Sequence, residues 1–246
     1  MTASFPITMH SGNPSPDETT ELIELLAGAW MGVAPRGASI MPPGLSRAEQ
    51  YRILEAVFAA EFRSNWKTEA LRWCTDQDGR IAAFACLDPL HGGEIAAGAG
   101  EVPITPEEME AFLPGVPASY RQRLIVLVKQ SIVSDKRAWS GITHVALEGD
   151  GRIFEIRGVG VHPDQKGRGI GARFMKALLA EAAGALVTIT TQNMGAANFY
   201  QRLGFEIILE EEWTLPYAEG AETLPHWVMS TLAPGMESRH ALNAHE

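Results

Sequence analysis

The chain has 246 residues, and its 30 acidic side chains outnumber its 20 lysines and arginines, giving a formal net charge of −10 and a pI of about 5.2. This acidity argues against nucleic acid as the main partner, because phosphate backbones are bound by basic surfaces. No apolar stretch reaches the roughly 18 residues of a membrane span, and the first residues lack the pattern of a secretory signal. We therefore expect a cytoplasmic protein without a membrane partner.

The first third of the chain alternates predicted strands and helices. Residues 5–10 are expected to form a strand, and Asp17 is expected to cap a helix that ends near residue 31. Residues 32–45 are rich in Gly and Pro and predict a loop. Ser46 and Glu49 have the spacing of a capping box, which predicts that the next helix begins here and runs to about residue 66.

The middle of the chain contains two cysteines and two Asp-Gly turn signals. Cys74 and Cys86 lie in apolar segments, so we expect buried free thiols rather than a disulfide or a metal pair. The chain is expected to hold no metal. Strands are predicted at 71–74 and 81–87, and again at 143–147 and 152–161, on either side of the two turns. Between them we expect a loop over 88–104, a short helix from 105 and a longer helix over 117–136.

The last third shows a regular alternation of elements. The pattern predicts a helix to about residue 183, a strand over 186–191, a helix over 196–203 that ends at Gly204, and strands over 205–213 and 227–232. Taken with the first two thirds, this predicts a single mixed α/β domain over 1–234 and a flexible tail over 235–246.

The most informative segment runs from Val159 to Gly171. An alternating apolar run leads into a Pro-Asp turn and then into three glycines at the start of an amphipathic helix. The free amides of a helix N-terminus and the helix dipole favour an anion there. The segment does not match the Walker loop and matches the dinucleotide fingerprint only in part.

A second motif, Asn193 to Phe205, follows at a fixed separation. Together the two motifs resemble the GCN5-related N-acetyltransferases (GNAT), whose patterns are V-x-P-x-x-[QR]-x-x-G-x-G and N-x-x-A-x-x-F-Y-x-x-x-G-F. The resemblance covers roughly 153–213. It implies a mixed central sheet of about six to seven strands flanked by helices, with a helical insertion in the N-terminal half. The acetyl-CoA core would span about 142–232 and the acceptor side about 5–140.

The resemblance implies acetyl-CoA as the cosubstrate. The pantetheine arm would lie along the backbone of Val159, Gly160 and Val161, and Asn193 and Asn198 would lie near it. Asn193 is also placed to cap a helix. Pyrophosphate would be bound by the amides of Lys166, Gly167, Arg168, Gly169, Ile170, Gly171 and Ala172. The family usually has Gln or Arg at the position of Lys166, and a lysine keeps the charge but loses the bidentate fork, so more of the binding falls to the backbone.

Two side chains are candidates for proton transfer. By resemblance, Tyr200 points at the thioester sulfur, and a phenol is protonated at neutral pH and can donate to a thiolate. Glu155 lies mid-strand between large apolar residues and is a candidate general base, at the position where the histone-modifying members carry a catalytic glutamate. His162 is a weaker candidate base. Transfer through ordered water, with no fixed base, stays open.

The expected acceptor is a primary amine of a small molecule. V-G-V-x-P-D, F-Y-x-R-L-G-F and a closing Trp-x-Met make the C-terminal half similar to the puromycin N-acetyltransferase type, which implies an antibiotic-like or aminonucleoside acceptor. A protein or peptide acceptor, a non-catalytic acyl-CoA sensor, and a monomer or a homodimer all stay open. Candidate acceptor contacts are Trp30, Trp66, Tyr120, Trp139, Trp213, His226 and Trp227. Glu210, Glu211 and Glu212 either line the mouth of the pocket or form a solvated face.

Overall fold

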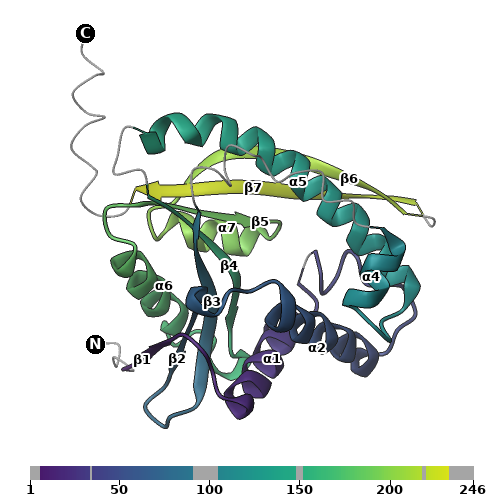
Figure 1. Cartoon of the computed structure of the whole chain (residues 1–246), viewed down its shortest axis with the longest axis horizontal. Helices are drawn as coiled ribbons and strands as arrows, with labels where there is room; N and C mark the ends of the chain where they lie inside the picture. Colours follow the sequence, from purple (N-terminus) through teal and green to yellow (C-terminus); the bar gives the residue numbers. More distant parts are fainter. Residues whose placement is uncertain (1–5, 34, 91–104, 148–151, 218–219, 233–246) are drawn as a thin grey trace.

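The computed structural model describes residues 6–33, 35–90, 105–147, 152–217 and 220–232 (Figure 1). Seven strands form one mixed sheet in the order β1-β2-β3-β4-β5-β7-β6. Only β4 and β5 pair in parallel, and the other neighbours are antiparallel. The strands are β1 (Thr8–Ser11), β2 (Leu71–Thr75), β3 (Ile81–Leu90), β4 (Ile153–Val161), β5 (Leu186–Thr191), β6 (Glu206–Tyr217) and β7 (Gly220–Leu232). The predicted fold class, a mixed sheet flanked by helices, is confirmed.

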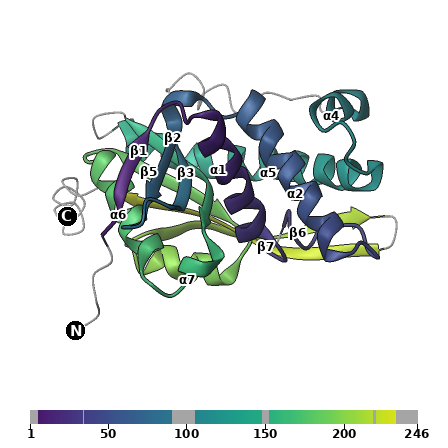
Figure 2. The ribbon, with the colours of Figure 1, turned by 90° about the horizontal axis from the view of Figure 1, so that it is seen from below.

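Helices cover both faces of this sheet (Figures 1 and 2). Helices α6 and α7 lie on one face, α1 and α2 lie side by side on the other, and α5 runs along β6. The described helices are α1 (Pro16–Trp30), α2 (Arg47–Ser64), α4 (Pro106–Phe112), α5 (Ala118–Leu147), α6 (Ile170–Glu181) and α7 (Met194–Gln201), with single turns η1 (Thr68–Ala70) and η2 (Pro163–Gln165). Among them, none is long and apolar enough to cross a membrane.

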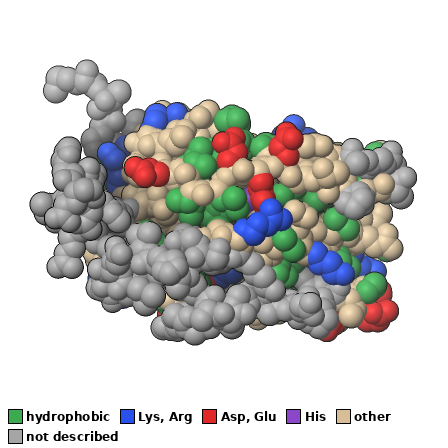
Figure 3. All heavy atoms as spheres, turned by 90° about the horizontal axis from the view of Figure 1, so that it is seen from above, with side chains coloured by type: hydrophobic (Ala, Val, Ile, Leu, Met, Phe, Trp, Pro, Cys, Tyr) green, Lys and Arg blue, Asp and Glu red, His purple; other side chains and the backbone are tan. Residues whose placement is uncertain are grey.

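Each face of the sheet has its own apolar core. Under α1, α2 and α5 the core is centred on large aromatic side chains, among them Phe58, Phe84 and Trp213. Under α6 and α7 it is made of small residues of β3 with Phe174 and Trp227. Both cysteines are buried and unpaired, as predicted. On the outer face seen in Figure 3, acidic and basic side chains lie scattered among hydrophobic ones over the part of the chain that is described.

The helix starts follow the capping rules, with one shift. Ser46 and Glu49 form the predicted capping box of α2. Helix α1, however, is capped by Ser15 and not by Asp17: the Ser15 hydroxyl accepts from the amide of Glu18, and the Glu18 carboxylate accepts from the amide of Ser15 at 2.8 Å. Asp17 therefore lies inside the first turn, where a negative charge still suits the helix dipole.

The prediction of a strand over 143–147 is wrong. Helix α5 continues through this stretch to Leu147, because a helix that is already formed gains one hydrogen bond for each residue added. A stretch of only five residues does not by itself distinguish strand from helix. The predicted loop over 88–104 is wrong for 88–90, which belong to β3. The turn predicted at Asp150-Gly151 and the tail over 235–246 lie outside the described residues.

Candidate active site

The site is set up by a divergence between two central strands. Strands β4 and β5 pair only where Ile153–Ile156 faces Leu186–Ile189. Just beyond, the register between β3 and β4 shifts and Gly158 adopts φ +64°, a left-handed conformation that favours glycine. A Cβ at Gly158 would also lie 2.9 Å from the Trp66 ring. This irregularity leaves the last residues of β4 without a β5 partner in the described ladder.

A cavity of about 1170 Å³ lies beside this divergence. One wall comes from the diverging strands and α7, with Gly158, Val159, Asn193 and Tyr200. The opposite walls come from α1, α2 and the segment that follows it, α4 and α5. Their lining residues include Trp30, Phe58, Trp66, Met109, Phe112, Leu124, Leu127 and Val128. The cavity therefore joins the region predicted to bind the donor with the half predicted to bind the acceptor.

The glycine loop forms an uncapped helix start. Gly169 is the N-cap of α6 at φ +72° and offers no side chain, whereas Ser15 and Ser46 cap α1 and α2. The first amides of α6, beginning with that of Ile170, are therefore available to an anion. Two of the predicted amides are already in use: the Lys166 amide donates to the Pro163 carbonyl at 3.2 Å and that of Arg168 to the Gln165 carbonyl at 3.3 Å. The free amides are thus concentrated at Gly169–Ala172.

Two glycines predicted as donor contacts serve close packing. A Cβ at Gly160 would lie 2.7 Å from Leu26 Cδ2, so this glycine lets α1 approach β4. A Cβ at Gly171 would lie 3.1 Å from Val161 Cγ2, so Gly171 lets α6 approach the strand. The side chain of Ile170 is buried in the core. At these three positions only the main chain is left to face a ligand.

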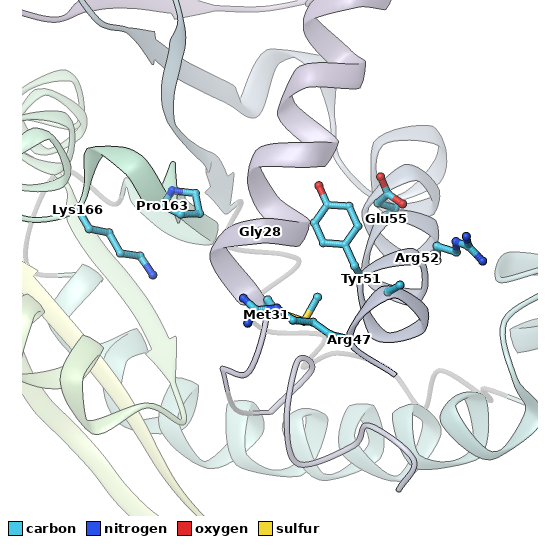
Figure 4. Close-up of a pocket in the computed structure, with 9 residues that line it drawn as sticks. Gly28, Met31, Arg47, Tyr51, Arg52, Glu55, Pro163 and Lys166 are labelled. Atoms are coloured by element: carbon cyan, nitrogen blue, oxygen red, sulfur yellow. The ribbon is translucent and has the colours of Figure 1, made fainter. Parts of the chain in front are cut away.

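Three polar side chains of the prediction lie away from the cavity. Lys166 extends toward the end of α1 and lines a second cavity of about 750 Å³ together with Arg47, Arg52 and Glu55 (Figure 4). Arg168 donates to the Gln165 side-chain oxygen at 3.2 Å. Asn198 is exposed on α7. The structure therefore does not bring these side chains to the walls that carry Tyr200.

Tyr200 is buried, and its ring lines the main cavity. Burial raises the pKa of its phenol, so the hydroxyl stays protonated at neutral pH. In the part of the chain that the structure describes, no hydrogen bond to this hydroxyl is found. Asn193 lines the same wall, and its side chain caps α7 by accepting from the Ala196 amide at 2.9 Å. The capping role predicted for Asn193 is confirmed.

Glu155 also lines the cavity, with a side chain that is 19% exposed. The Arg157 Nε atom lies 3.6 Å from its carboxylate, and Asp88 of β3 lies directly opposite on the sheet. The weaker candidate, His162, has another role: its Nδ1 atom accepts from the Asp164 amide at 3.2 Å and caps η2. Of the two candidate bases, the structure places only Glu155 in the cavity.

Some of the aromatic residues predicted to contact the acceptor line the cavity, and others are buried in the cores. Trp30, Trp66 and Trp213 line the cavity, whereas Tyr120 and Trp227 are buried in the apolar cores. The side chain of Trp139 lies outside the described residues.

Glu211 does not line the cavity, and its carboxylate is hydrogen-bonded within the protein. Its carboxylate accepts from Ser134 of α5, from the Trp213 indole at 2.7 Å and from Arg137 at 3.0 Å. The bonds from Ser134 and Arg137 connect α5 to β6. Glu210 and Glu212 are exposed, as expected for a solvated face.

His226, a predicted acceptor contact, is a core residue and not a lining residue of the cavity: it is fully buried, stacks on Trp213 and is hydrogen-bonded through Nδ1 to the Gln192 side chain at 2.6 Å. One cavity residue was missed by the sequence reasoning. Asp88 is a buried acid at the end of β3, in a segment predicted to be loop. The one signal for Asp88 was an acid following a strand of apolar residues.

Comparisons with known proteins agree with this geometry. A family model described as an acetyltransferase (GNAT) domain matches residues 122–207, from within α5 to the start of β6. A search of curated protein sequences gave no match. In the part of the chain that is described, no cluster of three or more His, Cys, Asp or Glu side chains could hold a metal ion.

Three of the solved structures that this chain resembles are named as acetyltransferases or related to them. A polyamine N-acetyltransferase of Drosophila melanogaster is 19% identical, with a TM-score of 0.55, covering 91% of this chain and 99% of that one. Arylalkylamine N-acetyltransferase 2 of Aedes aegypti is 15% identical, with a TM-score of 0.56 and coverage of 92% and 99%. A histone acetyltransferase HPA2-related protein of Corynebacterium glutamicum is 14% identical, with a TM-score of 0.53 and coverage of 96% and 99%. The fold is the GNAT fold, as the two motifs predict. The likeness to the puromycin type stays a prediction.

Proposed function

We propose that the protein is an acetyl-CoA-dependent N-acetyltransferase that acetylates the primary amine of a small molecule. The main observation behind this proposal is that one strand, β4, connects a cavity to an anion-binding helix start. The open edge of β4 borders the cavity that contains Tyr200, and the same strand leads through η2 into the uncapped N-terminus of α6. A donor with a diphosphate at one end and a reactive acyl group at the other fits this arrangement.

The residues at the α6 start fit a diphosphate. Main-chain amides at Gly169–Ala172 supply donors, and the helix dipole adds a favourable field. Glycines at 167 and 169, with φ values of +80° and +72°, allow the backbone to approach a ligand closely. Acetyl-CoA, when bound, supplies the thioester from which the acetyl group is transferred.

Tyr200 and Glu155 divide the proton transfers in this proposal. As the acceptor nitrogen bonds to the acetyl carbon and the carbon–sulfur bond breaks, the Tyr200 hydroxyl gives its proton to the departing sulfur. The acceptor attacks as the neutral amine, so one that enters as an ammonium first gives a proton to water. Glu155, directly or through a water, takes the proton that the nitrogen then loses as it bonds to the acetyl carbon. Two observations support these roles: both side chains line one cavity, and the Tyr200 hydroxyl has no hydrogen-bond partner among the described residues.

The cavity walls support a small acceptor over a protein substrate. Met109 and Phe112 of α4 and Leu124 and Leu127 of α5 line the cavity opposite the diverging strands. The bonds from Ser134 and Arg137 to Glu211 hold α5 against β6. A protein chain needs an open groove, whereas α4 and α5 form a wall on the acceptor side.

Two measurements test the proposal. Acetyl-CoA should raise the melting temperature, because a ligand that binds only the folded state stabilises it by about 2.7 kcal/mol at a hundred times its Kd. No shift at millimolar acetyl-CoA would remove the donor assignment. Release of free thiol is then measured with polyamines, arylalkylamines, aminonucleosides, aminoglycosides and peptides. Stabilisation without thiol release from any amine would favour the acyl-CoA sensor, and release with peptides alone would favour the protein acetyltransferase.

A further inference from the structure

Two carboxylates face each other across the sheet beside the cavity. Asp88 of β3 and Glu155 of β4 are direct cross-strand partners, and both line the cavity. Like charges placed directly opposite on one sheet face are destabilising. The arrangement therefore needs a nearby cation.

One guanidinium serves both carboxylates. The Arg157 Nη2 atom donates to Asp88 Oδ2, and its Nε atom lies 3.6 Å from Glu155. Burial acts to lower the pKa of Arg157, but the charges of Glu155 and Asp88 outweigh it, and the pKa is raised. Arg157 is thus held in its charged form, and the three side chains together carry one net negative charge.

The second oxygen of Asp88 has no hydrogen-bond donor in the described part of the chain. The residue is only 4% exposed, and Oδ1 is a buried acceptor. A buried, unpaired carboxylate oxygen is costly, because it has lost its water without gaining a donor. The unpaired oxygen belongs to a cavity-lining side chain, so a ligand that supplies a charged N–H group would satisfy it.

The neighbouring acid is not available for this task. Glu61 of α2 lines the same cavity, but its carboxylate accepts from Arg36 at 2.9 Å and from the Asn65 side chain at 2.9 Å. Three aromatic side chains, Trp30, Phe58 and Trp66, line the same cavity. One net negative charge beside aromatic rings is the chemistry that recognises an ammonium group on an apolar skeleton.

We propose that Asp88 is the ammonium-binding residue of the acceptor pocket, and that the acceptors are amines that enter positively charged and carry an apolar skeleton. The ammonium donates a hydrogen bond to Asp88 Oδ1, and the skeleton packs against the aromatic wall. The inference rests on the proposed function for calling the ligand an acceptor. The binding itself requires no acetyl transfer.

The test compares two probes of one shape, phenethylamine and 2-phenylethanol, which differ in the charged group. Their Kd values are measured by calorimetry on the full chain, with and without coenzyme A. Wild type should bind phenethylamine more tightly. Asp88→Asn should weaken phenethylamine binding about tenfold or more, since bonds to charged groups are strong, and leave 2-phenylethanol binding within about twofold. Asp88→Glu, which keeps the charge, should retain part of the preference.

Glu108→Gln is the matched control. It removes a carboxylate from another part of the cavity lining, and glutamine still completes the capping box with Thr105. Its Kd for phenethylamine should stay within about twofold of wild type. Equal loss of both probes in Asp88→Asn, an unchanged Kd for phenethylamine, or no charge preference in wild type would each overturn the proposal. Thiol release is measured separately, so failure of acetyl transfer is seen as a different result.

Discussion

The indole Nε1 atom of Trp30, the last residue of α1, donates a hydrogen bond to the main-chain carbonyl of Val159 on β4, over 3.1 Å. That carbonyl belongs to the strand along which a pantetheine arm is predicted to pair. A ligand amide that used the same oxygen would compete with the indole for it. The pair therefore connects the acceptor-side helix α1 directly to the strand of the donor site.

Trp30→Phe is expected to bind acetyl-CoA two- to tenfold more tightly. The substitution removes the competing donor and keeps an aromatic ring against Phe58, and a neutral hydrogen bond contributes about 0.5–1.5 kcal/mol. Calorimetric titration with acetyl-CoA measures the change. Trp66→Phe, a cavity tryptophan on the neighbouring segment, serves as the comparison. Weaker binding by Trp30→Phe alone would mean that the indole assists the donor instead of competing with it.

Tyr200→Phe is expected to lower kcat by about a hundredfold, in the range of general acid catalysis, with little change in the Kd for acetyl-CoA. The phenol makes no hydrogen bond in the described part of the chain, so its loss should leave the melting temperature nearly unchanged. Steady-state kinetics and a thermal melt are the measurements. Phe199→Leu, one residue earlier on α7, controls for repacking. An unchanged kcat would exclude Tyr200 as the acid.

Gly160→Ala is expected to destabilise the fold by about 1–3 kcal/mol, because the new methyl group would meet Leu26 in a packed core. Gly28→Ala is the matched control. Its Cβ would lie 3.4 Å from Pro163 Cγ, and alanine within a helix is favoured over glycine by about 0.5–1 kcal/mol. Urea denaturation of both variants should give changes of opposite sign. Equal stability of the two would contradict the close approach of α1 to β4.

His226 should make the folded state sensitive to acid. Burial lowers its pKa to about 4, while an unfolded chain has an ordinary value near 6.5. Between these values the unfolded state binds more protons, so the free energy of unfolding falls as the pH drops from about 6.5 to about 4, by about 3 kcal/mol in total. Above pH 7 this contribution is fully present.

Urea denaturation at several pH values measures this effect. Other acids titrate in the same range, so the informative quantity is the difference between wild type and His226→Phe, which keeps a ring against Trp213. That difference should change between pH 6.5 and 4 and stay constant above. Parallel stability curves for the two proteins would show that His226 is not held neutral by burial.

Local rules predicted much of the fold. The capping box at Ser46 and the helix start at Thr105 are set by contacts within four residues, and the glycine loop and its helix follow from a short, specific spacing. The wrong prediction at 143–147 also comes from relying on local rules. The stretch is short, and the helix that precedes it determines its structure. The two motifs were enough to predict the sheet and its class.

Contacts between distant segments could not be predicted in the same way. Asp88 and Glu155 become neighbours through the register of β3 against β4, and the bulge at Gly158 changes that register. His226 meets Gln192 because β7 is inserted between β5 and β6. A sequence shows neither register nor strand order. The acceptor half of the cavity is therefore the part that needed the structure.

The free edge that the divergence from β5 leaves on β4 offers main-chain amides and carbonyls, which are the same whichever side chain is attached. The opposite walls of the cavity are built from the side chains of α1, α2, α4 and α5. Random substitution can thus alter which molecules the enclosed space admits while leaving the strand edge chemically intact. The strand edge therefore tolerates mutation, whereas the helical walls can vary in sequence. A few substitutions in these walls are enough to change which acceptor the cavity admits.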